Sequence, residues 1–95
     1  MHILKIEHPV RDFDAWKATF DSDPIGREQG GVRRYRIMRP HDDPQFVMVD
    51  LEFETRDEAY AFEAALRTLW GRAVAEGLIE SPRTRFVEEV ESKER

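Results

Sequence analysis

The sequence of 95 residues contains no cysteine. This absence excludes disulfide bonds, thiolate metal ligands and a cysteine nucleophile, and it suits a reducing compartment. The sequence also has no run approaching the about 18 consecutive apolar residues that a membrane-spanning helix needs. Its first ten residues mix His2, Lys5 and Glu7 with their apolar neighbours, which is unlike an export signal. We therefore expect a cytoplasmic protein without a membrane partner.

Positive charge is in deficit, because the formal net charge is -5. A chain of this balance repels phosphate backbones and anionic lipid. The sequence therefore argues against nucleic acid as a partner.

What is present is a folding composition, with 40% hydrophobic and 37% charged residues. A chain of this length closes one apolar core, so residues 1–95 are expected to form a single domain. Such a core is thin, and pairing with a second copy would bury more apolar surface. The charged residues 91–95 have nothing to bury and are expected to form a solvated tail.

Alternation of side chains predicts four strands, over residues 2–8, 32–38, 46–53 and 83–90. A helix is expected from Asp12, whose carboxylate can cap the free amides ahead of Phe13, Trp16 and Phe20. A short helical turn is expected after Asp23-Pro24, ending at Gly30-Gly31.

A second helix is expected from Thr55, because Thr55 and Glu58 have the spacing of a capping box. This helix carries Phe62, Leu66 and Leu69 on one side and is expected to run past Trp70 to an end at Gly77.

The element order βαββαβ predicts an α+β domain of the ferredoxin-like kind. Two interleaved right-handed crossovers place both helices on one face of a four-stranded antiparallel sheet in the order 4-1-3-2. The helix-facing side chains are then expected to be apolar, namely Leu4, Ile6, Val47, Val49, Leu51 and Phe53. The opposite face is expected to mix apolar and charged side chains, namely Ile3, Lys5, Glu7, Phe46, Met48, Asp50 and Glu52, joined by Arg34, Arg36 and Met38.

An uncovered sheet face of this makeup is commonly covered by another subunit. We therefore expect a homodimer in which Arg34 or Arg36 pairs with Asp50 or Glu52 near a two-fold interface. The same element order also occurs in the RNA-recognition motif, which stacks bases on aromatic rings of its open face. Here Leu4, Met48 and Asp50 stand where those rings belong, so RNA binding is not expected.

The runs Phe13-Asp14-Ala15-Trp16-Lys17 and Gly31-Val32-Arg33-Arg34-Tyr35, followed by residues 46–54 leading into a capped helix, resemble the dimeric α+β barrel superfamily. That superfamily includes the antibiotic biosynthesis monooxygenases, and the resemblance covers nearly the whole chain. Its monooxygenase and haem-degrading members rely on an asparagine, a tryptophan and often a histidine in the second helix. The sequence has no asparagine and no histidine there, and no cofactor is implied.

Five residues are candidates for a site. Trp16 and Trp70 could wall a pocket for a flat ligand, although core packing is the simpler interpretation of both. His8 and Tyr35 are candidates for proton transfer, against the alternative of a satisfied, buried tyrosine. Arg34 could bind a ligand carboxylate.

Other histidines and carboxylates offer less. His2 and His8 lie on one strand face but about 20 Å apart at roughly 3.3 Å per residue, which is too far to share a metal ion. Asp50 and Glu52 could act as acid and base, but neighbouring cations would keep both ionised.

The sequence therefore predicts a homodimer that binds a small organic molecule. If it is an enzyme, the resemblance implies a cofactor-independent monooxygenase- or cyclase-like reaction on an aromatic or polyketide-like compound. The alternative is a non-catalytic dimeric module for binding or scaffolding, and the sequence leaves both open.

Overall fold

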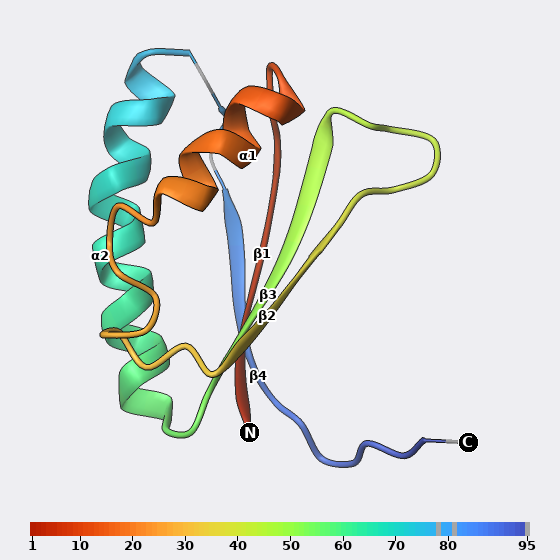
Figure 1. The fold of residues 1–95 in the computed structure, drawn as a ribbon, viewed down its shortest axis with the longest axis vertical. Helices are drawn as coiled ribbons and strands as arrows, with labels where there is room; N and C mark the ends of the chain where they lie inside the picture. Colours follow the sequence, from red (N-terminus) through yellow and green to blue (C-terminus); the bar gives the residue numbers. More distant parts are fainter. Residues whose placement is uncertain (78, 81, 95) are drawn as a thin grey trace.

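The computed structural model describes residues 1–77, 79–80 and 82–94, and it has the predicted element order (Figure 1). The strands and helices are β1 (His2–Pro9), α1 (Phe13–Ser22), β2 (Arg34–Met38), β3 (Phe46–Phe53), α2 (Arg56–Ala75) and β4 (Arg83–Glu88).

The four strands form one antiparallel sheet in the order β2-β3-β1-β4. This is the predicted order 4-1-3-2 counted from the other edge, so the ferredoxin-like topology is confirmed. Figure 1 shows α1 and α2 on the same side of the sheet, as predicted. The register places Asp50 of β3 directly between Lys5 of β1 and Arg36 of β2.

The start of α1 is the predicted one, because the Asp12 carboxylate accepts hydrogen bonds from the amides of Asp14 and Ala15 at 3.0 and 3.3 Å. No helix forms after Asp23, and the expected helical turn is reduced to one hydrogen-bonded turn over residues 27–31, closed by the Gly30 amide on the Gly26 carbonyl at 3.0 Å. Asp23 instead ends α1 in the left-handed conformation, with φ of 54°, and its carboxylate accepts from the amide of Arg27 at 2.8 Å. That bond holds the short loop between α1 and this turn.

The capping box at the start of α2 is confirmed. The Thr55 hydroxyl accepts from the amide of Glu58 at 3.1 Å, and the Glu58 carboxylate accepts from the amide of Thr55 at 3.2 Å. The helix runs past Trp70, and Gly77 follows it with φ of 73°, a conformation that glycine adopts without strain.

Two strands are shorter than predicted. The second begins at Arg34 rather than Val32, because the chain leaves a turn at Gly31, where φ is 93°. The fourth ends at Glu88 rather than Val90. Beyond the hydrogen bond from the Glu89 amide to the Met1 carbonyl, β1 offers no further residue to pair with.

The core lies between the sheet and the helices. It consists of Leu4, Ile6, Val49, Leu51 and Phe53 from the sheet with Ala59, Phe62 and Trp70 from α2. The helix-facing side of the sheet is therefore the predicted one. The tail beyond β4 is exposed over residues 89–94 and leaves the body of the molecule (Figure 1), while Arg95 lies outside the described residues.

Candidate functional site

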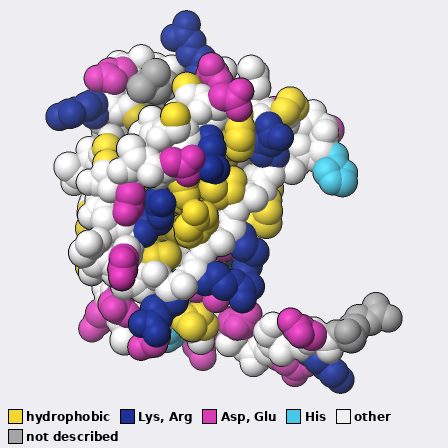
Figure 2. Space-filling view, in the orientation of Figure 1, with side chains coloured by type: hydrophobic (Ala, Val, Ile, Leu, Met, Phe, Trp, Pro, Cys, Tyr) yellow, Lys and Arg dark blue, Asp and Glu magenta, His cyan; other side chains and the backbone are white. Residues whose placement is uncertain are grey.

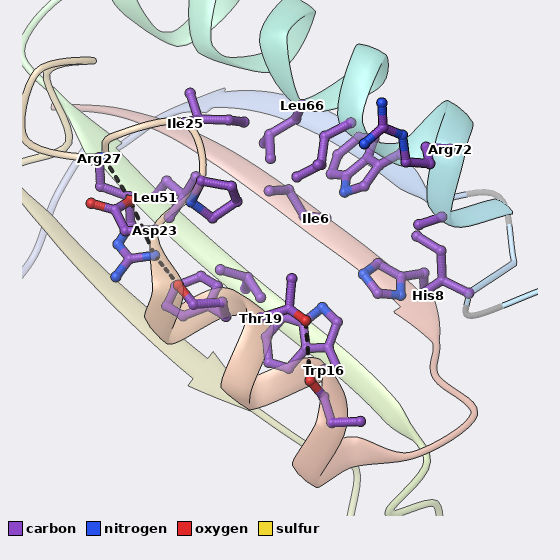
Figure 3. Close-up of a pocket in the computed structure, with 18 of the residues that line it drawn as sticks. Ile6, His8, Trp16, Thr19, Asp23, Ile25, Arg27, Leu51, Leu66 and Arg72 are labelled. Carbon is purple, nitrogen blue, oxygen red and sulfur yellow. Dashed lines mark hydrogen bonds and ion pairs between the residues drawn. The ribbon is translucent and has the colours of Figure 1, made fainter. Parts of the chain in front are cut away.

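A cavity of ≈ 350 Å³ lies between α1, α2 and the sheet (Figure 3). The sheet forms its floor with Ile6, Val49 and Leu51, and the helices supply Trp16 and Trp70. Figure 2 shows hydrophobic side chains gathered near the centre of this face of the molecule, with charged side chains around them. A volume of this size, with a mainly apolar lining and few polar groups, is typical of a small-molecule site.

The aromatic stripe of α1 explains why the space is open. Phe13, Trp16 and Phe20 stack along the helix at centroid distances of 5.7 and 5.3 Å. None of the three is fully buried, and α1 has no buried residue at all. Trp16 and Phe20 of this stripe therefore form a wall of the cavity and do not fill the space beneath the helix.

His8 stands at the end of this cavity. It is only 2% exposed, and Figure 3 shows its ring projecting from β1 into the cavity beside Trp16. Its ring meets the indoles of Trp16 and Trp70 edge to face, with centroids 6.1 and 6.5 Å away. The structure thus brings together three of the five predicted site residues.

One ring nitrogen of His8 has a defined partner. Nδ1 lies 2.9 Å from the carbonyl oxygen of Pro9. Burial lowers the pKa of His8 below 6.5, and the hydrogen bond to Pro9 opposes this only in part. The imidazole is therefore neutral at pH 7, which suits a proton acceptor.

The indole N–H groups add polarity to the apolar walls. Neither Trp16 nor Trp70 donates a hydrogen bond to another residue in the described part of the chain. Each indole N–H can therefore meet a ligand oxygen. Charged residues line the end of the cavity around His8, namely Arg11, Asp12, Arg72 and Glu76.

Tyr35 lies outside the cavity. Its ring is on the helix side of the sheet, as predicted, and packs edge to face on Phe20 with centroids 5.1 Å apart. The side chain is not buried, however, since 43% of the residue is exposed. The reason is the position of β2 at the edge of the sheet, where Phe20 and the Arg27 guanidinium lie against the ring but no further strand follows β2.

Arg34 also lies away from the cavity, on the opposite face of the sheet. There it is 3.3 Å from Glu52, while Arg36 binds both Glu52 and Asp50 at 2.8 Å and Lys5 binds Asp50 at 2.8 Å. The predicted pairing of Arg34 or Arg36 with Asp50 or Glu52 is confirmed within the chain, while its position near a two-fold interface stays a prediction. These cations cover the two carboxylates, which are 4% and 7% exposed.

The charge state of Asp50 follows from this cover. Burial alone would raise its pKa, but hydrogen bonds and attraction from Lys5 and Arg36 outweigh burial and lower the pKa below 3.8. Asp50 therefore remains ionised at neutral pH and serves as a fixed anion for two cations.

Two contributors to the site carry no recognisable signal in the sequence. The Pro9 carbonyl fixes the His8 ring, and the direction of a backbone carbonyl cannot be inferred from the residue type. Arg27 supports the wall: it donates to the carbonyl of Phe20 at 2.7 Å and lies 4.0 Å above the Phe20 ring. Only the loop made by Asp23 brings it there.

The described residues contain no group of three or more His, Asp or Glu side chains arranged to hold a metal ion. Among them, too, no helix combines the length and the apolar content needed to cross a bilayer.

The element order, strand order and one-sided helices define a ferredoxin-like α+β fold, and solved structures share it. A Nitrosomonas europaea protein provisionally described as an antibiotic biosynthesis monooxygenase superimposes with a TM-score of 0.62 at 20% identity, over 96% of this chain and 100% of that one. A Deinococcus radiodurans protein described in the same way gives 0.68 at 11%, over 100% and 98%.

A dimeric ferredoxin-like protein from an uncultured marine organism gives a TM-score of 0.66 at 14% identity, over 97% of this chain and 96% of that one. No protein-family model and no curated protein match the sequence. At these identities the similarity establishes the fold.

Proposed function

We propose that the protein is a homodimer that binds a small, flat, largely apolar organic molecule between its helices and its sheet. The observation that carries the proposal is the position of His8. A neutral imidazole stands between two indoles at the end of a cavity of ≈ 350 Å³ with a mainly apolar lining. Aromatic walls suit a ring-shaped ligand, because rings pack against them edge to face or offset.

The dimer is supported by the face of the sheet that carries no helix. Met38 and Met48 are opposite one another on this face, beside the ion pairs of Asp50 and Glu52. A second copy would cover this apolar and charged surface and keep the ion-pair network from water. Dimeric ferredoxin-like proteins are among the similar structures.

As an enzyme, the protein would use His8 as the proton acceptor. The proton of a ligand O–H or acidic C–H group moves to Nε2, and the electron pair stays on the ligand oxygen or carbon. In a cofactor-independent monooxygenase-like reaction, molecular oxygen then converts a ring CH₂ to C=O, and its second oxygen atom leaves as water. Trp16 and Trp70 hold the ring against His8. Tyr35 and Arg34 stand outside this arrangement.

A thermal-shift screen with bicyclic and tricyclic aromatic compounds tests the ligand proposal. We expect hits whose stabilisation is lost in Trp16→Ala, which removes one wall. Tyr60→Ala is the matched control, because Tyr60 is an exposed aromatic residue that does not line the cavity. Hits that stabilise Trp16→Ala and the wild type equally would place binding elsewhere and refute the proposal.

The second candidate is a non-catalytic dimeric module, which the burial of Trp70 favours. Trp70 is 8% exposed and belongs to the core cluster, so this wall of the cavity also has a structural role that requires no ligand. Incubating each hit with the protein in air, followed by mass spectrometry, separates the two. Recovery of unchanged ligand supports the module, while a product that depends on His8 supports the enzyme.

A further inference from the structure

We infer that the cavity selects ligands that present a hydroxyl hydrogen to Nε2 of His8, so that phenols and enols bind and their O-methyl ethers are rejected. This inference rests on the proposed ligand-binding function. It adds which hydrogen-bonding group the ligand must carry and which end of the cavity that group occupies.

The hydrogen of the neutral His8 imidazole is placed by the hydrogen bond to Pro9. The Pro9 carbonyl lies 2.9 Å from Nδ1, and a carbonyl oxygen can only accept a hydrogen bond. Nδ1 must therefore carry hydrogen and donate it. In the neutral imidazole the other nitrogen, Nε2, is then a lone-pair acceptor with no hydrogen to give.

The lone pair on Nε2 of His8 is available to a ligand. Nε2 makes no hydrogen bond to any residue in the described part of the chain, although His8 is nearly buried. Every fully buried polar side-chain atom in that part of the chain has a hydrogen-bond partner. Because Nε2 has none, it is not fully buried and remains accessible from the cavity. His8 lines the cavity, and its ring projects into it (Figure 3).

A ligand hydroxyl matches the hydrogen-bonding groups of both His8 and the indole walls. The two indoles that contact His8 have only N–H groups to offer as polar partners, and these can only donate. A hydroxyl group can donate to Nε2 and accept from an indole N–H. An ether or ketone oxygen can only accept, and it would leave Nε2 buried against the ligand without a partner. A site built to bond a hydroxyl rejects analogues without one, because its own polar group is left unpaired.

The carboxylates of Asp12 and Glu76 also line the cavity, but His8 is the acceptor that contacts both indoles. The Asp12 carboxylate is held at the start of α1, because its Oδ1 accepts from two amides there. Arg11 and Arg72 are donors, and Glu76 stands beyond the last turn of α2. The acceptor between the two indoles is the one on His8.

The test uses the full chain at pH 8 with 2-naphthol and 2-methoxynaphthalene, which differ only in the O–H group. We expect naphthol to bind about tenfold to a hundredfold more tightly, from the penalty of an unpaired acceptor. The preference should fall to about onefold to threefold in His8→Phe, which keeps a ring of similar size. It should persist in Tyr60→Ala.

A second measurement does not depend on the variant folding. Nitrogen-15 NMR of the wild type should show the His8 tautomer with hydrogen on Nδ1, and 2-naphthol but not its methyl ether should shift the Nε2 resonance. Equal affinity for both probes, with binding lost in Trp16→Ala, overturns the inference and leaves the ligand site standing. Failure of both probes and of the aromatic panel refutes the site and the inference together.

Discussion

The imidazole of His8 and the indole of Trp16 meet edge to face, with ring centroids 6.1 Å apart and planes inclined at 68°. Trp70 flanks the same imidazole on the other side. The two tryptophans differ in their surroundings: Trp70 belongs to the core cluster, whereas Trp16 is partly buried and packs against it from α1. Both indoles therefore make the same kind of contact with His8, but only Trp70 also belongs to the core cluster.

Truncating the two tryptophans should separate stability from binding. Trp70→Ala empties part of the core and should lower the free energy of unfolding by about 3–5 kcal/mol. Trp16→Ala removes a half-buried wall and should cost only about 1–2 kcal/mol, yet abolish aromatic hits. Urea denaturation and thermal shift measure the two effects. Equal destabilisation by both variants would contradict this division.

His8 should make the fold sensitive to mild acid. Its pKa is lowered in the folded state, so below about 6.5 the unfolded chain binds a proton that the folded protein does not. Stability should therefore be full above pH 6.5 and fall as the pH drops from there towards the folded pKa. His8→Phe should lose this component, and denaturation of both proteins at pH 8 provides the reference. Identical slopes in the variant and the wild type between pH 5 and 8 would count against it.

Asp50→Ala should weaken both the fold and the proposed dimer, because Lys5 and Arg36 lose a shared, nearly buried anion. Both cations are more than a third exposed, so we expect a loss of about 1–3 kcal/mol, below the range for fully buried pairs. Sedimentation should show a shift towards monomer.

The control for Asp50→Ala is Asp21→Ala, which breaks an exposed ion pair to Lys17 within α1 and should change stability by at most about 0.5 kcal/mol. An Asp50→Ala dimer as stable as the wild type would remove the proposed interface.

Replacing Gly30 and Gly71 by alanine should change the stability of the fold in opposite directions. A Cβ at Gly30 would lie 2.5 Å from Cδ1 of Phe62, a core ring, so Gly30→Ala should destabilise by roughly 1–3 kcal/mol. Gly71 in α2 has nothing within 4 Å of such a Cβ, and Gly71→Ala should stabilise the helix by about 0.5–1 kcal/mol. Thermal denaturation of both variants checks the pair, and a stabilised Gly30→Ala would contradict the close approach.

Much of the fold could be predicted because local signals agreed with one another. The capping box at Thr55, the alternation over residues 46–53 and the cap at Asp12 each act over a few residues. Once the element order was known, chirality left few topologies to consider. The faces of the sheet followed from the two-residue period of side chains along a strand, which placed Asp50 and Glu52 on the face that carries no helix.

The site could be predicted only in part, because it depends on where separate elements meet. Trp16 and His8 were candidates by residue type, but their contact depends on how α1 lies over the end of β1. Tyr35 was assigned to the correct face, yet its exposure depends on β2 being an edge strand. Asp23 could cap either end of a helix, and only its left-handed backbone shows which.

The looseness of α1 has a consequence for motion. A helix without a fully buried side chain is held to the sheet by fewer apolar contacts than α2, and such elements open at lower free energy than the rest of a domain. Its amides should exchange with deuterium ahead of those of the central strands. A ligand bound beneath α1 would add apolar contacts to the helix and slow this exchange. The exchange rate of the α1 amides would then show whether the cavity is occupied.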